Sequence, residues 1–248
     1  GGRMQRLSWT VVAALAVLAL AVAGCGSSGE AQHGGTVQIL NTAGGVDSLA
    51  SGNNSSAYGA GSKATGEGAT AIGGQMQVMN GSTWEWETWS TEATGKQSLA
   101  LGTAAHATEY SAIAIGATSE ASGRQTVALG SAATARGDKA IANGNQARAY
   151  DVLAVAIGAS AQAQGPRSVA IGANAVAYDE SNTAVGQFSG TAGAYSSAFG
   201  RQAKARVERG TALGAQTDVR AVNSVALGAY SIADRENTVS VGSLGNER

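Results

Sequence analysis

The 248-residue sequence contains few of the residues that build an ordinary globular core or an active site. It has one cysteine, one proline and two histidines, and aromatic residues make up 5% of the chain. A single cysteine excludes a disulfide framework within the chain, and so few aromatic side chains argue against a large core of ordinary composition. Acid–base and metal chemistry need clustered groups, whereas His33 and His106 are far apart and the carboxylates are scattered. We therefore predict no enzymatic activity, no cofactor and no metal site.

A strong charge of either sign is also lacking. The 16 Lys and Arg residues nearly balance the 17 Asp and Glu residues, so the net charge is −1 at pH 7. Domains that bind nucleic acid usually carry a clear basic excess. No nucleic-acid partner is expected.

Glycine is abundant, with 36 residues, and it is periodic. The residue two positions before each periodic glycine is alanine, except at the last repeat, where it is Ser240. A fixed short period predicts a solenoid, in which each coil buries its apolar face by stacking on its neighbours. The periodic glycines occupy every fourteenth position and are Gly102, Gly116, Gly130, Gly144, Gly158, Gly172, Gly186, Gly200, Gly214, Gly228 and Gly242.

Each repeat unit contains two segments that alternate with period two. In the first, bulky residues flank the alanine, as in Val169-Ala170-Ile171, and strand geometry places them on the opposite face from the alanine. In the second, small residues two apart, such as Ala161 and Ala163, alternate with variable polar residues. This pattern predicts two short strands and two turns per coil, and so an all-β solenoid.

The turn at the half-period varies in sequence. Glycine occupies Gly123, Gly137 and other equivalent positions, but Asp151 and Val207 replace it elsewhere. Gly and Asp suit left-handed turn conformations and Val does not. We therefore expect left-handed residues at the Gly and Asp positions and a different turn at Val207. Calcium-binding rolls have a nonapeptide repeat, so these aspartates do not predict calcium sites.

The first strand of each coil is apolar or small on both faces, which implies that something covers its second face. Two bulky side chains per coil contribute roughly 3 to 6 kcal/mol of burial. Ordering a coil costs about 1.5 kcal/mol for each residue. The burial within one chain is therefore too small to offset the cost of ordering its coils. We therefore predict that the coils pack in parallel against copies of the same chain.

The N-terminal segment, residues 1–24, is predicted to be a secretory signal. A basic region from Arg3 to Arg6 precedes an apolar run from Trp9 to Val22, which is too short to predict a spanning helix. The run ends in Val22-Ala23-Gly24-Cys25 and resembles a bacterial lipobox, in which Cys25 would be lipidated. Ordinary signal cleavage fits the same residues, and both alternatives stay open. Residues 25–44 are expected to form a Gly/Ser-rich tether and a first strand near Thr36 to Leu40.

The roll is expected over residues 45–232, with an interruption at about residues 75–95. The step from Gly73 to Gly102 exceeds two repeat units by a single position, and the interval contains Trp84, Trp86 and Trp89. One interpretation is a bulged coil whose indoles pack across a subunit interface. The other is a protruding loop whose aromatic side chains contact a ligand.

The last segment, residues 233–248, makes the resemblance to a known family specific. Asp234-Arg235-Glu236-Asn237, followed by Thr238-Val239-Ser240-Val241-Gly242, resembles the start of the neck of a trimeric autotransporter adhesin. The repeated Ser-Val-Ala-Ile-Gly phrase, as at residues 168–172, resembles the head of the same YadA-like family. The resemblance implies a left-handed parallel β-roll with one repeat unit per coil, assembled as a parallel homotrimer.

The resemblance also implies a function and a location. It implies a non-enzymatic adhesin head, exposed at the bacterial cell surface and held at the outer membrane, that binds a host extracellular-matrix protein or a cell-surface glycan. Basic residues near the C-terminal coils are candidate contacts for an anionic ligand. Neutralisation by Glu208 and Asp218 is the alternative interpretation. The candidate contacts are Arg201, Lys204, Arg206 and Arg220, together with the three tryptophans.

The chain departs from the family pattern in two respects. It stops at Arg248, where a stalk and a membrane anchor would follow, so it is either a fragment or a variant. A lipid on Cys25 would anchor the opposite end. A trimeric fibre or spacer protein of a phage or bacterial surface layer is the alternative function. An ice-binding surface is not expected, because the outward positions carry no threonine ladder.

Overall fold

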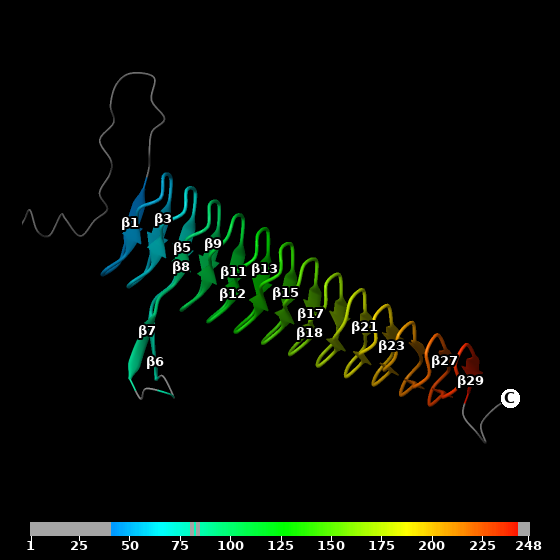
Figure 1. Cartoon of the computed structure of the whole chain (residues 1–248). Helices are drawn as coiled ribbons and strands as arrows, with labels where there is room; N and C mark the ends of the chain where they lie inside the picture. Colours follow the sequence, from blue (N-terminus) through cyan, green and yellow to red (C-terminus); the bar gives the residue numbers. More distant parts are fainter. Residues whose placement is uncertain (1–40, 80–81, 83–84, 243–248) are drawn as a thin grey trace, which may run out of the picture.

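The computed structural model describes residues 41–79, 82 and 85–242. The expected signal peptide, Cys25, the strand at Thr36 to Leu40 and Trp84 lie outside these residues. The described chain is an elongated parallel β-solenoid with one projecting hairpin (Figure 1). Within these ranges the chain contains no helix, and so none that is long and apolar enough to cross a membrane.

Each coil contributes one strand to each of two parallel sheets, called sheet A and sheet B. Sheet A has 14 strands and sheet B has 13, and every strand except the two at the ends of each sheet pairs with strands of the coils before and after it. The strands of sheet A are β1 (Thr42–Gly44), β3 (Ser56–Tyr58), β5 (Thr70–Ile72), β9 (Leu99–Leu101), β11 (Ile113–Ile115), β13 (Val127–Leu129), β15 (Ile141–Asn143), β17 (Val155–Ile157), β19 (Val169–Ile171), β21 (Thr183–Val185), β23 (Ser197–Phe199), β25 (Thr211–Leu213), β27 (Val225–Leu227) and β29 (Val239–Val241).

Sheet B is built from two-residue strands that alternate with those of sheet A along the chain. Its strands are β2 (Leu49–Ala50), β4 (Lys63–Ala64), β8 (Glu92–Ala93), β10 (His106–Ala107), β12 (Glu120–Ala121), β14 (Thr134–Ala135), β16 (Arg148–Ala149), β18 (Gln162–Ala163), β20 (Val176–Ala177), β22 (Gly190–Thr191), β24 (Lys204–Ala205), β26 (Asp218–Val219) and β28 (Ile232–Ala233). The predicted all-β solenoid with two strands and two turns per coil is confirmed.

The register of both sheets follows the sequence period. Ala156 pairs with Ala170, one period later, and neighbouring coils repeat this step. The exception is Ala71, which pairs with Ala100 across the interrupted interval. This interval therefore contains one coil with an insertion, rather than two coils. The first strand among the described residues is β1, which starts at Thr42, before the expected residue 45, and Gly45 follows this strand.

The interior between the sheets is filled by small side chains. The alanines of both sheets are fully buried, for example Ala156 and Ala170 in sheet A and Ala149 and Ala163 in sheet B. Their bulky neighbours, such as Val169 and Ile171, point outward and are only partly buried. The predicted alternation is confirmed. Val219 is the largest side chain that is fully buried.

Glycine is required at the full-period turns. Gly116 has φ 131°, and a Cβ there would lie 2.4 Å from the carbonyl oxygen of Gly130 in the next coil. Such a position excludes any side chain, because both the conformation and the space forbid it. Glycine therefore recurs with this period because the turns of successive coils stack too closely to accommodate a side chain.

The prediction for the half-period turns is wrong by two positions. Gly123 and Gly137 do not have positive φ, and the left-handed residues lie two positions later, as in Leu153 (φ 59°) and Arg209 (φ 54°). The turn at Val207 is of the same kind as the others. The Gly210 N–H donates to the Val207 carbonyl at 3.2 Å, just as the equivalent bond closes the turn at Asp151. The β-branched Val207 fits in this turn because Arg209, and not Val207, adopts the left-handed conformation.

The lack of interior space yields a stability prediction. Ala163→Leu adds three carbon atoms to a fully buried position, so we expect the free energy of unfolding to fall by about 1 to 3 kcal/mol. Gln162→Leu, at the adjacent outward position of β18, is the matched control and should change stability by less than about 0.5 kcal/mol. Denaturant unfolding followed by circular dichroism measures both. Equal effects of the two substitutions would contradict an interior limited to small side chains.

Candidate functional site

The inserted segment is an antiparallel hairpin that projects from the edge of the roll (Figure 1). It replaces the turn between β5 and β8 and consists of β6 (Met76–Met79) and β7 (Trp86–Trp89). The segment thus protrudes from the roll, as in the second of the two interpretations given for residues 75–95, and does not form a bulged coil.

Both faces of the hairpin carry exposed apolar side chains. Met76 pairs with Trp89, and Met79 pairs with Trp86. Because residues three apart in a strand point to opposite sides, the two indoles lie on opposite faces. Trp86 is 64% exposed, and the Trp89 Nε1–H donates to Glu87 Oε2 at 3.4 Å. An isolated two-stranded hairpin is marginally stable in water, so this one depends on its attachment to the roll.

That attachment is made by buried polar groups at the hairpin base. The hydroxyl of Thr91, fully buried, lies 2.9 Å from the carbonyl oxygen of Gly74 and 2.7 Å from that of Gly102. The His106 ring contacts the Ser90 carbonyl oxygen through Nε2 at 3.0 Å. The two ends of the insertion are thereby fixed to the following coil.

The outward face of sheet B carries a column of variable residues, one per coil. In its N-terminal part opposite charges are paired. Lys63 Nζ lies 2.8 Å from Glu92 Oε1, and Arg136 contacts both carboxylate oxygens of Glu120 at 3.1 and 3.2 Å. Burial raises the pKa of Glu92, but hydrogen bonds from Lys63 and Ser90 outweigh this effect and hold the pKa below its ordinary value.

Near the C-terminus, Asp218 lies between two arginines. Its carboxylate accepts from Arg206 Nε at 2.7 Å and from Arg220 Nε at 2.9 Å, and its side chain is only 13% exposed. Burial raises the pKa of Asp218, but the hydrogen bonds and positive charges of Arg206 and Arg220 lower it by more. The pKa of Asp218 therefore lies below its ordinary value. The expected neutralisation by Asp218 is therefore present, but one carboxylate serves two guanidinium groups.

The remaining predicted basic residues differ in their surroundings. Glu208 pairs with Arg209 at 3.3 Å rather than with the arginines of the cluster. Lys204 is exposed and has no ion pair within the described residues. Arg201 is exposed on the preceding turn and does not line the hollow beside Lys204. The structure therefore brings together Lys204, Arg206 and Arg220 but not Arg201.

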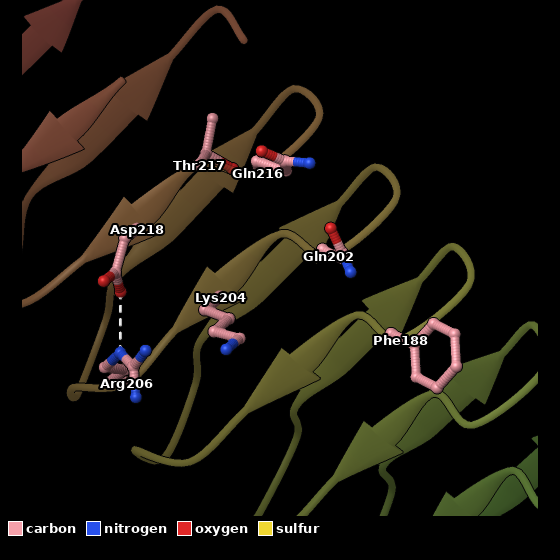
Figure 2. Close-up of a pocket in the computed structure, with 7 residues that line it drawn as sticks. All are labelled: Phe188, Gln202, Lys204, Arg206, Gln216, Thr217 and Asp218. Carbon is pink, nitrogen blue, oxygen red and sulfur yellow. Dashed lines mark hydrogen bonds and ion pairs between the residues drawn. The ribbon is translucent and has the colours of Figure 1, made fainter. Parts of the chain in front are cut away.

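A hollow of about 530 Å³ lies beside this cluster. Figure 2 shows Phe188, Gln202 and Gln216 on successive turns, with Lys204 and Arg206 on the adjoining strand segment. Phe188, Gln202 and Gln216 were not among the predicted contacts. These three residues are spaced by one full repeat in the sequence, so the stacking of the coils places them in a row along one edge of the roll. This spacing is the signal that could have identified them.

The outward face of sheet A forms an apolar ladder. Its exposed apolar side chains range from 37% exposed at Ile171 to 63% at Val239, and Asn143 is a polar interruption. Monomeric proteins rarely expose apolar patches that extend over many elements. The ladder is therefore a candidate assembly surface.

The predicted neck residues lie within the regular solenoid. Asp234, Arg235, Glu236 and Asn237 form the turn between β28 and β29, and Asn237 accepts a hydrogen bond from Asn223 at 2.8 Å. Strand β29 pairs in register with β27. Up to Gly242 this segment continues the roll, and the neck beyond it stays a prediction.

Two comparisons with known proteins give matches. The sequence matches the family described as "YadA head domain repeat (2 copies)" over more than half of its length. The crystal structure of the collagen-binding domain of the Yersinia adhesin YadA is similar, with 27% identity, a TM-score of 0.42, and coverage of 71% of this chain and 83% of that one. A search of curated proteins found no match. The residues matched to the family are 43–62, 50–75, 93–119, 121–147, 152–175, 192–217 and 221–244.

The arginine cluster gives a pH-dependent prediction. Because the folded pKa of Asp218 is depressed, its ion pairs stabilise the protein above the unfolded pKa of about 3.9. This contribution is lost as the pH falls through the folded pKa. Asp218→Asn should therefore lower stability at pH 7, by no more than about 1 kcal/mol because both arginines are more than half exposed. The difference from wild type should shrink below about pH 4.

Denaturant unfolding at pH 7, 5 and 3 measures this difference. Asp234→Asn is the matched control, because Asp234 is exposed and has no ion pair within the described ranges. An effect of Asp218→Asn that is independent of pH would contradict the assignment.

Proposed function

The chain belongs to the YadA head-domain family, and from this premise we propose that it is the head of a trimeric bacterial adhesin that attaches to host cells or extracellular matrix. The observation that carries the proposal is that the family match recurs between residues 43 and 244, with its main gaps at residues 76–92 and 176–191. The adhesins of this family are not enzymes, and the family role is attachment.

The proposed trimer is supported by the outward face of sheet A. Its ladder runs through Leu101, Ile157, Ile171 and Leu227, each between 37% and 39% exposed. An interior of alanine contributes little burial per residue, so covering this ladder supplies the apolar contact that a single roll lacks. Three copies packed through sheet A leave sheet B facing outward.

Attachment is proposed to use the surfaces that sheet A leaves free. These are the variable outward column of sheet B and the projecting hairpin, with Trp86, Trp89 and the undescribed Trp84 as aromatic contacts. Three identical faces make the binding multivalent, so individually weak contacts suffice. Candidate partners are an extracellular-matrix protein or a cell-surface glycan.

The location is proposed from the family and from the N-terminal sequence. Family adhesins are exposed at the cell surface, and we place this chain there, at the outer membrane. The anchor is either a lipid on Cys25 or a stalk that follows a neck starting near residue 233. The signal peptide over residues 1–24 and the tether over residues 25–44 also remain predictions.

The trimer is tested at the sheet A face. Ile171→Asp places three carboxylates in the proposed apolar interface, so the protein should change from a trimer to a monomer at micromolar concentration. Sedimentation velocity measures the change. Gln162→Asp, which adds the same charge on the outward face of sheet B, is the control and should remain trimeric. A wild-type monomer, or a trimer unaffected by Ile171→Asp, would contradict the proposed interface.

Adhesion is tested with beads that display the assembled head. Beads should bind surfaces coated with collagen, fibronectin or host glycans more than surfaces coated with albumin. The double substitution Trp86→Ala and Trp89→Ala should reduce attachment at least about tenfold, equivalent to about 1.4 kcal/mol, with the trimer intact. Tyr195→Ala, at another exposed aromatic residue of the roll, is the control. Loss of the trimer would instead indicate that the indoles pack between subunits.

A further inference from the structure

One strand of sheet B leaves its outward face almost bare. Gly190 of β22 pairs with Val176 on one side and Lys204 on the other, so it occupies the outward column without a side chain. A Cβ at Gly190 would have no atom within 4 Å. Two positions later, Ala192 adds only a methyl group. The absence of side chains on this one coil creates a trough across the sheet.

The two walls of the trough have different chemistry. On one side are Val176 and Tyr178, and on the other are Lys204 and Arg206. The trough encloses about 240 Å³ and adjoins the larger hollow, with Phe188, Lys204 and Arg206 lining both. Tyr178 and Phe188 are 54% and 48% exposed, so their rings are available for contact. The combined volume is in the range of small-ligand sites.

The electrostatic balance at the trough is positive. Asp218 is bonded to both Arg206 and Arg220, so one negative charge offsets two positive charges. Lys204 adds a third positive charge, with no ion pair in the described part of the chain. The hydrogen bond from Arg206 Nε to Asp218 orients the guanidinium group beside the hollow (Figure 2). An anionic group is the complement of this wall.

The backbone of the trough excludes one common mode of peptide binding. The Gly190 N–H donates to the Ala203 carbonyl and the Ala192 N–H donates to the Ala205 carbonyl. On the other side, the carbonyls of Ser189 and Thr191 accept from Val176 and Tyr178. Since these groups are paired within the sheet, an extended peptide cannot add as a strand. Recognition must use the side chains of the walls.

We propose that the trough at Gly190 binds an acidic saccharide, carrying a sulfate or a carboxylate. The acidic group contacts Lys204 and Arg206, and the apolar face of a sugar ring packs against Tyr178 or Phe188. The amides of Gln202 and Gln216 lie along the adjoining hollow and hydrogen bond to hydroxyl groups of the next sugar. This inference deepens the proposed adhesive function, because it requires sheet B to face outward in the assembled head.

The experiment measures saccharide binding to the purified full chain by isothermal titration calorimetry. The probes are a heparin hexasaccharide for sulfate, 3′-sialyllactose for carboxylate, and lactose as the neutral control. We expect one or both acidic probes to bind, lactose not to bind, and binding to weaken as salt is raised from about 50 to about 500 mM.

Two variants and one matched control locate the site. Lys204→Gln removes the unpaired cation, and Gly190→Trp fills the trough at a position with free space. Each should weaken binding at least tenfold. Arg148→Gln is the control, because Arg148 is an exposed cation in the same outward column, without an ion pair in the described ranges. It should leave binding unchanged, and circular dichroism of each variant should match that of wild type.

The outcomes separate this inference from the function on which it rests. If neither acidic probe binds, or if Arg148→Gln weakens binding as much as Lys204→Gln does, the inference is overturned. In either case, if head-coated beads attach to matrix-coated surfaces, the adhesive function is still supported. If the beads attach to no host surface, that function fails, even where the purified chain binds an acidic saccharide at the trough.

Discussion

The structure depends on the lack of space between its two sheets. The interior columns hold Ala, Ser and Thr almost throughout, and Val219 is accepted only because Gly210 faces it. A Cβ at residue 210 would lie 3.0 Å from Val219 Cγ1. The space for the two additional methyl groups of Val219, compared with alanine, therefore comes from the missing side chain of Gly210. Interiors packed at this density tolerate few changes in volume. The small side chains allow each coil to be very short, and bulky residues must point outward.

The outward position of the bulky residues links the fold of one chain to its assembly. In an ordinary domain the largest apolar side chains fill the interior, whereas here Ile157, Ile171 and Leu213 remain partly exposed on sheet A. Most coils therefore present one or two apolar side chains at the same height as those of their neighbours, and polar residues such as Thr183 and Ser197 occupy some of the positions. An interface built on this ladder grows with the number of coils, and this explains why one repeated sequence specifies both the roll and the proposed trimer.

The fold was largely predictable because its determinants are local and repeated. The glycine period and the alternation around Ala170 predict the repeat of short strands and the placement of alanines and bulky residues on opposite faces, and both are confirmed. Which face lies inside the roll did not follow from the alternation. The left-handed turn residues were misplaced by two positions, since residue preference does not reveal which residue of a turn carries the positive φ. The interval between Gly73 and Gly102 was ambiguous, because its length fits two coils with a bulge as well as one coil with a hairpin. The trough beside Lys204 was missed because it is formed by the absence of a side chain at Gly190.

The variable outward residues of sheet B are not constrained by interior packing or by strand pairing, unlike the rest of the roll. Residues such as Arg148, Gln162 and Gly190 contribute nothing to the interior, which their neighbours Ala149, Ala163 and Thr191 fill. The strand backbone is paired between coils whatever these outward side chains are. A substitution there changes the surface while leaving the register and the interior intact. Because the register places each residue beside its equivalent in the next repeat, a bare position, an aromatic residue and a cation in consecutive coils become neighbours. The solenoid can therefore acquire or lose a binding trough through single substitutions that leave its fold unchanged.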